Sequence, residues 1–205
     1  VRKFHRANQF EKGIRGGVRA GKTYPLMAEA IGLSFINRPC YHLSLSPSEQ
    51  NGFETCLEVL KEHCDRDGIP YDWIVSKNEF RIYWGPTKKD WGRILIHGMD
   101  SEWLGLTCAS GDLNEPFSIH KEAYKDWSDR ISDPKAKVLR KIWGGTAIPE
   151  TMQWGHEYYE LDKDVTEDLY TDTFTTYGNT FLPAKYIKAQ ERLYKGKQRE
   201  VRLLG

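Results

Sequence analysis

The chain has 205 residues, of which 39% are hydrophobic and 13% aromatic, and its formal net charge is +1. This length is enough for one α/β domain with a sizeable core, and the aromatic content excludes a disordered chain. The near-zero charge excludes a globally basic nucleic-acid binder, so any contact with DNA must use a local basic patch. No apolar run is long enough to span a membrane and no secretory signal is recognisable, so we expect no membrane partner.

The predicted elements follow from hydrophobic periodicity and turn residues, taken in chain order. In the first half we predict a helix end within 1–9, a weak strand at 12–15, a helix at 23–36, a strand at 40–46, a helix from about 48 to 65, and short strands at 73–75, 80–84 and 93–96. In the second half we predict a helix at 119–131, a strand at 138–144, a helix at 152–159, a strand at 169–176 and a helix at 183–195. Strands that alternate with helices predict an α/β fold, with a mostly parallel sheet covered by helices on both faces.

Four cysteines are present, and none forms a C-x-x-C pair or a spacing that is typical of zinc sites. Cys56, Leu60 and Cys64 repeat every four residues, which places them on one face of a helix. We therefore expect them in the core rather than around a metal, and free thiols indicate a reducing compartment such as the cytosol.

Residues 16–23 fit the pattern G-x-x-x-x-G-K-[ST], the loop that wraps the phosphates of a nucleoside triphosphate. Gly16 and Gly21 allow the tight turn that brings backbone N–H groups up to the phosphate oxygens. Lys22 places a positive charge at the β- and γ-phosphates, and Thr23 offers a hydroxyl to Mg²⁺. The candidate nucleotide-binding residues are Gly16, Gly17, Val18, Arg19, Ala20, Gly21, Lys22 and Thr23.

The flanks of this loop favour a phosphate site over a glycine-rich turn that matches by chance. A strand candidate precedes the loop, and the helix that follows places Leu26, Ala30, Leu33 and Ile36 on one face. Pro25 falls in the first turn of that helix, where its missing N–H is tolerated.

Hydrolysis also requires a group that orients and deprotonates water, and residues 111–116 supply the candidates. Glu115 is the candidate catalytic carboxylate. Asn114 stands where an acidic residue would hold the water shell of the metal, and Asp112 lies on the same side of an extended strand as Asn114. Either could serve Mg²⁺; the alternative is a surface turn. We expect this strand to lie beside the strand that enters the phosphate loop.

A second turn at a predicted strand end, 145–149, places the hydroxyl of Thr146 where ligands sit in open α/β sheets. We interpret Thr146 as a sensor of the γ-phosphate, with an ordinary turn as the alternative.

Together these motifs resemble the ATPase domain of the large terminase subunit of tailed phages, over nearly the whole chain. The matching segments are 4–6, 14–23, 114–117, 145–149 with Trp154, and 177–183. The resemblance implies a P-loop NTPase fold of the RecA-like (ASCE) class, a bound ATP and Mg²⁺, and Glu115, Arg19 and Lys22 as catalytic residues. Two features depart from the family: Asn114 replaces the usual aspartate, and the upstream glutamine segment that contacts adenine is not evident.

The resemblance also implies that ATP hydrolysis drives double-stranded DNA into a viral procapsid, in the host cytoplasm. Implied partners are the portal protein, the small terminase subunit and further copies in a ring on the procapsid, with a monomer expected for the isolated domain. Residues 1–205 are expected to form the ATPase domain, with a nuclease domain after residue 205. The positive charge for the transition state would come from Arg19 or from a neighbour, with Arg93 and Arg130 as candidates; Arg19 could instead pair with a carboxylate to hold the loop.

Two other functions remain open from the residues. A phosphotransferase would use Asp112 or Glu115 as a base towards a small acceptor. A nucleotide-binding module would bind ATP without turnover.

Overall fold

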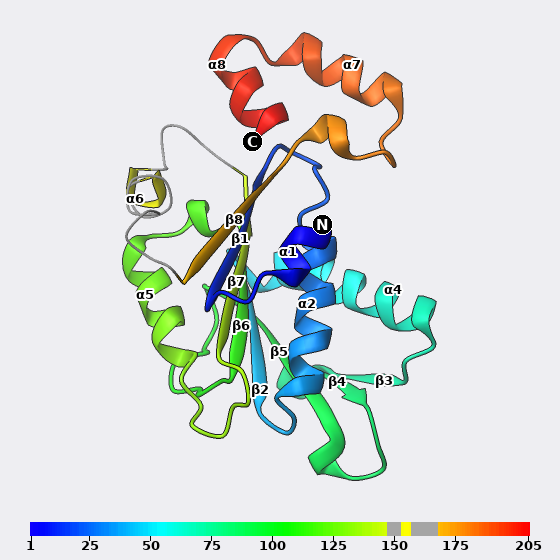
Figure 1. The fold of residues 1–205 in the computed structure, drawn as a ribbon, viewed down its shortest axis with the longest axis vertical. Coiled ribbons are helices and arrows are strands. Elements are labelled where there is room, and N and C mark those ends of the chain that lie inside the picture. The colour runs from blue at the N-terminus through cyan, green and yellow to red at the C-terminus, as the bar shows by residue number, and fades with distance from the viewer. Residues whose placement is uncertain (147–152, 157–167) are drawn as a thin grey trace.

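The computed structural model describes residues 1–146, 153–156 and 168–205, and within these residues the fold centres on one eight-stranded sheet (Figure 1). The strands are β1 (Glu11–Gly16), β2 (Tyr41–Ser46), β3 (Tyr71–Ile74), β4 (Glu79–Tyr83), β5 (Trp91–Gly98), β6 (Ser110–Asn114), β7 (Arg140–Gly145) and β8 (Leu169–Phe174). Their order is β3-β4-β5-β2-β6-β7-β1-β8. In this order every pair from β5 to β8 is parallel, whereas β4 runs antiparallel to both β3 and β5. The predicted mostly parallel sheet is confirmed.

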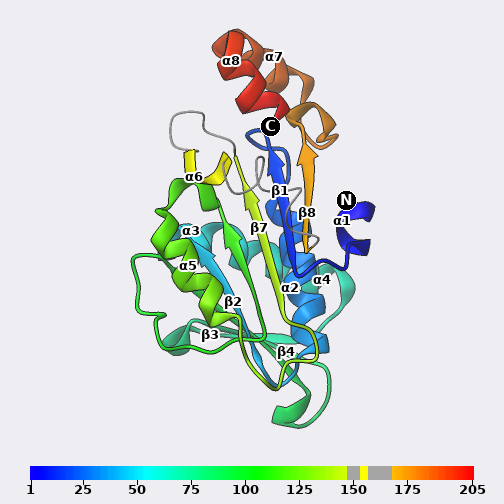
Figure 2. The same cartoon turned by 60° about the vertical axis from the view of Figure 1, so that its left-hand side comes forward.

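Helices cover both faces of this sheet (Figure 2). The described helices are α1 (Arg2–Arg6), α2 (Thr23–Ile36), α3 (Glu49–Gly52), α4 (Glu58–Asp67), α5 (Lys121–Arg130), α6 (Gln153–His156), α7 (Ala184–Leu193) and α8 (Gly196–Arg199). Short 3-10 or π turns are η1 (Phe53–Leu57), η2 (Val75–Lys77), η3 (Lys88–Asp90), η4 (Pro116–Ser118), η6 (Thr176–Gly178) and η7 (Glu200–Leu204). One apolar core lies under α2 and α4, and a second lies under α5. The predicted α/β class with two covered faces is therefore confirmed.

One expectation about the sheet is wrong. The sequence predicts the strand that carries Glu115 beside β1, but β7 lies between β6 and β1 and pairs with both. Because pairing across a sheet depends on long-range packing, the position of β7 could not be deduced from the order of elements along the chain.

The packing of the helices agrees with most of the predicted pattern. Cys56, Leu60 and Cys64 are fully buried, and all four cysteines are free, as the spacing predicts. In α2 the predicted apolar face is wrong at its end, because Ile36 is 40% exposed at the last turn of the helix. Met27 and Ile31 are buried instead, which makes the buried arc of α2 broader than a single stripe.

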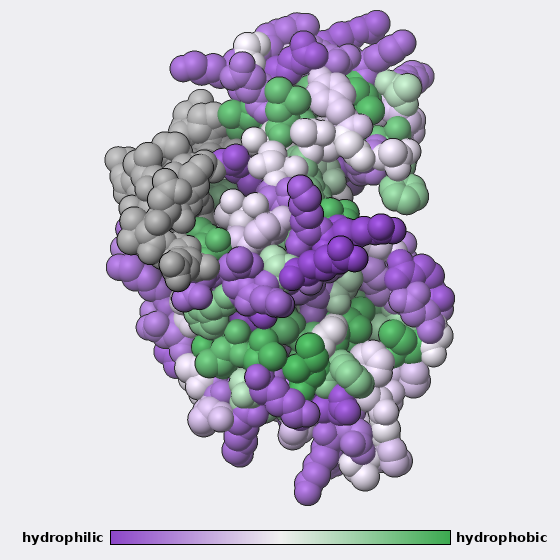
Figure 3. Space-filling model, viewed as in Figure 1, coloured by the Kyte–Doolittle hydropathy of each residue, from purple (hydrophilic) through white to green (hydrophobic). Residues whose placement is uncertain are grey.

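The last elements, η6 to η7, form a cap beyond the carboxyl ends of β1 and β8 (Figures 1 and 2). Side chains of hydrophilic residues cover the outer rim of this cap (Figure 3). The predicted helix at 152–159 is described only at 153–156, and Ala147, Ile148 and Pro149 of the predicted turn lie outside the described residues. Among the described helices, none is long and apolar enough to cross a membrane.

Candidate nucleotide-binding site

The loop 16–23 joins β1 to α2 at the carboxyl edge of the parallel strands, as predicted. Arg19 and Gly21 both have positive φ, 60° and 81°, which produces the sharp bend before α2. A Cβ on Gly16 would lie 2.6 Å from the carbonyl oxygen of Phe174, so only glycine allows β1 and β8 to approach here. The N-terminus of α2 follows directly, and its free N–H groups favour an anion at this position.

Lys22 is buried inside the bend, and its amine contacts groups from two strand ends. Its Nζ donates to the carbonyl of Gly17 at 3.2 Å and to Oγ1 of Thr146 at 2.8 Å, and it lies 3.6 Å from Oε1 of Glu115. Burial lowers the pKa of Lys22, while the negative charge of Glu115 partly offsets that effect. A buried ammonium group makes strong, charge-assisted hydrogen bonds, and its role towards phosphate oxygens stays a prediction.

Glu115 follows the last residue of β6, and β7 holds it in place. The Glu115 backbone N–H donates to the carbonyl of Gly144 at 2.7 Å. Its carboxylate accepts two bonds from Thr146, one from the backbone N–H at 2.7 Å and one from the hydroxyl at 3.0 Å. Glu115 also has a φ of 56°, a strained value for this residue type, of the kind that is found at functional sites.

Thr146 thus connects Lys22 and Glu115, because its hydroxyl accepts from the lysine and donates to the glutamate. The three residues directly adjoin the start of α2 and the ends of β6 and β7, at the same edge of the sheet. The sequence motifs are therefore brought together in one cluster. Its role towards a γ-phosphate stays a prediction.

The two candidate metal residues of β6 have different surroundings. Asp112 is fully buried, and its carboxylate accepts from Ser44 at 2.9 Å and bonds His42 at 2.8 Å. These bonds tie β6 to β2 and favour a structural role for Asp112. Asn114 donates an amide hydrogen to Asn51 at 3.5 Å, which leaves its amide oxygen available.

At phosphate sites Mg²⁺ is usually coordinated by one or two protein ligands, and phosphate oxygens and waters complete its shell. The residues near the loop fit a site of this kind. The described residues contain no group of three or more His, Cys, Asp or Glu side chains that could hold an ion by itself. Thr23, a half-buried residue, begins α2, and the side chains of Thr23 and Asn114 contain the oxygen atoms that such an ion prefers.

The candidate arginines are separated by the fold. Arg19 is exposed on the loop itself. Arg93 forms a bidentate pair with the buried Glu79 and lies over Tyr41, which favours a structural role. Arg130 ends α5 beside Cys108, at the opposite edge of the sheet from the loop.

Sequence reasoning did not assign contacts between the C-terminal cap and the loop. The backbone N–H of Val18 donates to the carbonyl of Arg202 at 2.7 Å, and the Thr176 hydroxyl donates to the carbonyl of Val18 at 2.7 Å. The amide of Asn179 donates to the carbonyl of Arg19 at 2.8 Å. No local pattern signals such contacts, since the two segments are far apart along the chain.

Comparison with known proteins adds the fold relationship. No family model and no curated protein matches the sequence. The large terminase of a thermophilic bacteriophage superposes with a TM-score of 0.79 at 18% identity, over 97% of this chain and 48% of that structure. Structures of the same terminase with ADP and with ATP-gamma-S superpose as well. The chain thus spans about half the length of these terminase structures.

Two further solved structures cover single domains. The large terminase ATPase domain of Thermus phage P74-26 superposes with a TM-score of 0.64 at 12% identity, over 98% of this chain and 90% of that domain. The N-terminal domain of the DNA packaging ATPase from bacteriophage phi29 superposes with a TM-score of 0.51 at 10% identity, over 88% of this chain and 97% of that domain. At these identities the superpositions establish a shared fold.

Proposed function

We propose, on the premise that this chain has the fold of a phage large terminase ATPase domain, that it hydrolyses ATP to move double-stranded DNA into a procapsid. The observation that carries the proposal is the cluster of Lys22, Thr146 and Glu115 beside the loop 16–23. A phosphate cradle alone would only bind, whereas a held carboxylate next to it supplies a base for hydrolysis.

In the proposed reaction the loop N–H groups and Lys22 hold the β- and γ-phosphates. The Thr23 hydroxyl and the Asn114 amide oxygen would hold Mg²⁺ or its waters, and the ion supplies positive charge to the phosphate oxygens. Glu115 accepts a proton from water while the water oxygen bonds the γ-phosphorus and the bond to the leaving ADP oxygen breaks. Thr146 keeps the carboxylate aligned through its two hydrogen bonds.

A positive charge must offset the developing charge of the transition state, and an arginine in this role raises the rate by roughly a thousandfold or more. Arg19 is the candidate within the chain, because it is an exposed residue of the loop itself. A neighbouring copy in a ring is the other source. For the whole protein we also propose that it binds the portal protein and the small terminase subunit. We propose further that a nuclease domain follows residue 205 and that the protein acts in the host cytoplasm.

Phosphate release from Mg·ATP by purified protein tests the hydrolysis proposal. We expect Glu115→Gln to stop release while ATP still binds, and Lys22→Ala to lose binding. Transfer of phosphate only when a small hydroxyl acceptor is added would instead indicate a phosphotransferase. Tight ATP binding without release at high protein concentration would indicate a module without turnover.

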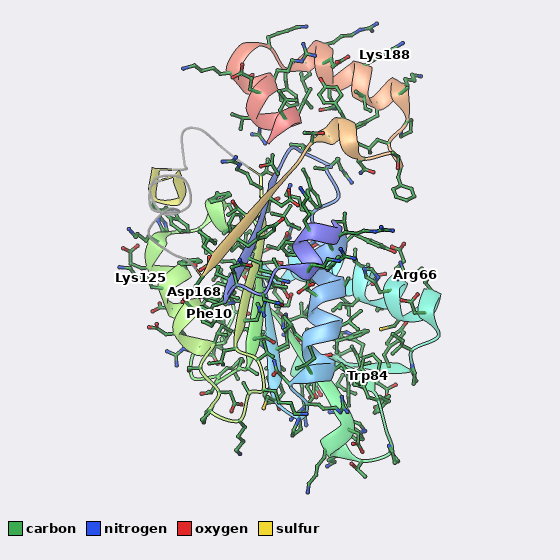
Figure 4. All side chains as sticks on the ribbon, viewed as in Figure 1. Phe10, Arg66, Trp84, Lys125, Asp168 and Lys188 are labelled. Carbon is green, nitrogen blue, oxygen red and sulfur yellow. The ribbon has the colours of Figure 1, made fainter. Side chains whose placement is uncertain are left out.

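The DNA part of the proposal requires a basic surface, and α7 exposes Lys185 and Lys188 on the rim of the cap, with Lys188 directed away from the sheet (Figure 4). We expect the double change Lys185→Glu and Lys188→Glu to weaken duplex DNA binding in fluorescence anisotropy, and wild-type binding to weaken with added salt. Lys125→Glu on the exposed side of α5 is the matched control. Equal losses in both variants would argue against a DNA contact through α7.

A further inference from the structure

Four adjacent strands end at the same edge of the sheet, so the segments that follow them lie side by side along this edge. In spatial order these are β6, β7, β1 and β8, and they lead into Glu115, Thr146, the loop 16–23 and the segment 175–183 (Figures 1 and 2). The proposed γ-phosphate end lies at Glu115 and Thr146. A nucleotide whose triphosphate follows the loop therefore extends its base towards the side of β8.

The segment after β8 is attached directly to the loop. The backbone N–H of Gly17 donates to the carbonyl of Phe174 at 3.0 Å, and Thr176 donates to the carbonyl of Val18. Asn179 then bonds the carbonyl of Arg19 at 2.8 Å, close to Gly21. The segment 175–183 thus forms the wall of the site on this side.

Phe181 stands on this wall with its ring in solvent. It is 94% exposed, the highest value among the large hydrophobic residues that the structure describes as exposed. Its position is nevertheless held, because its backbone N–H donates to Oδ1 of Asn179 at 3.1 Å, and the same amide contacts the loop. An exposed aromatic ring on a backbone that is bonded to the residue contacting the loop offers a face on which a base can stack.

The opposite side of the loop offers a poorer surface for a base. A hollow of about 750 Å³ adjoins Thr23 between α2 and α4. Its lining includes six charged side chains, of which four are acidic: Glu54, Glu58, Lys61, Glu62, Asp65 and Arg66. Among the described residues that line the hollow, Val59 is the single aliphatic one. Acidic groups there would repel the phosphates of a nucleotide, and none of the described residues that line the hollow is aromatic, so no ring is offered for a base to stack on.

We propose that Phe181 stacks on the nucleoside base of the bound triphosphate, an inference that rests on the proposed ATP site. Asn179 positions Phe181 rather than reading the base, since both ends of its amide are already bonded. Stacking meets the face of any base, so this contact contributes to affinity for ATP and GTP alike. It would also supply a base contact where no upstream glutamine segment is evident in residues 1–15.

Isothermal titration of the whole chain with Mg·ATP, Mg·GTP and Mg·tripolyphosphate tests this inference. Phe181→Ala is expected to weaken both nucleotides by roughly fivefold or more and to leave tripolyphosphate affinity unchanged. Phe181→Trp is expected to retain wild-type affinity for both nucleotides. Leu193→Ala, at an exposed position at the end of α7, is the matched control and is expected to change none of the three.

The outcomes separate the base contact from the nucleotide site itself. Wild-type affinity for ATP in Phe181→Ala, with binding lost in Lys22→Ala, would overturn the stacking contact and leave the ATP site standing. A base at the hollow beside Thr23 would produce this result, with Arg66→Ala as the variant that weakens binding. Equal loss of ATP and tripolyphosphate in Phe181→Ala would also overturn stacking. A wild-type chain that binds none of the three overturns both proposals.

Discussion

At the scale of single residues, the candidate site contains two groups that are unfavourable for stability. Lys22 is a buried ammonium group whose pKa burial lowers, and Glu115 is a non-glycine residue with positive φ. Functional sites commonly store such costs, because the same groups become favourable once the ligand or substrate is present. We therefore expect substitutions at Lys22 and Glu115 to abolish function without lowering the free energy of unfolding.

The first prediction concerns the pH dependence of stability. Because the folded-state pKa of Lys22 lies below its unfolded value, the unfolded chain binds more protons between the two values. The contribution of Lys22 to the free energy of unfolding should therefore rise with pH through that window, towards 10.5. We expect Lys22→Met to remove this rise and to leave the unfolding free energy at pH 7 unchanged or higher by up to about 1 kcal/mol, because the desolvation cost of the buried ammonium group disappears while Glu115, 33% exposed, keeps its bonds from Thr146. Urea unfolding of the wild-type chain and of Lys22→Met from pH 7 to 10 measures the difference. A marked loss of stability of Lys22→Met at pH 7 would contradict this prediction.

The second prediction separates the backbone strain at Glu115 from its chemistry. Glu115→Gly and Glu115→Ala both remove the carboxylate, so both should lose phosphate release. Only glycine relieves the φ of 56°, so Glu115→Gly should be more stable than Glu115→Ala by about 1 kcal/mol. Thermal unfolding of the two variants measures this difference, and equal stabilities would show that the αL conformation carries no cost.

At the scale of elements, close approach between β1 and β7 positions the loop relative to Thr146. Gly13 of β1 pairs with Trp143 of β7, and a Cβ on Gly13 would overlap the indole ring of Trp143. Trp143 is buried and donates to Glu11 at 3.0 Å, so the ring has little freedom to move. A glycine in the middle of β1 is thus required by the packing of the second core.

The third prediction uses this overlap. Gly13→Ala should lower the free energy of unfolding by about 2–3 kcal/mol or more, because the ring is rigid and enclosed. Gly32→Ala in α2 is the matched control, since a Cβ at Gly32 would meet nothing within 4 Å. It should raise stability by about 0.5–1 kcal/mol through helix propensity. Chemical denaturation measures both; similar effects in the two variants would argue against the proposed packing of Trp143.

At the scale of the whole molecule, the C-terminal cap closes on a loop that lies near the N-terminus. Val18 donates to the carbonyl of Arg202, and Leu203 of the cap is fully buried. A Cβ on Gly17 would lie 2.7 Å from the carbonyl oxygen of Arg202. The conformation of the loop 16–23 therefore depends on residues that are more than 170 positions further along the sequence, at 202–203.

The fourth prediction tests this long-range contact. Leu203→Ala should destabilise the chain by about 2–4 kcal/mol through the loss of buried surface, and it should speed hydrogen exchange at the Val18 amide. Leu204→Ala, at the neighbouring position that is 45% exposed, should do neither. Hydrogen exchange read by NMR or mass spectrometry measures the effect. A Val18 amide that exchanges equally slowly in both variants would show that the cap does not hold the loop.

The sequence by itself located the loop 16–23 between a strand and a helix, most of the helix and strand boundaries, and Glu115 as the candidate carboxylate, because these depend on local periodicity and on residue types at short spacing. It also predicted a mostly parallel sheet from alternating strands and helices. Only the tertiary structure decided that β7 separates β6 from β1, that Thr146 links Lys22 to Glu115, and that the cap bonds the loop. Those contacts join residues that are distant along the chain, and they form where the summed packing of whole elements is best, which local patterns do not encode.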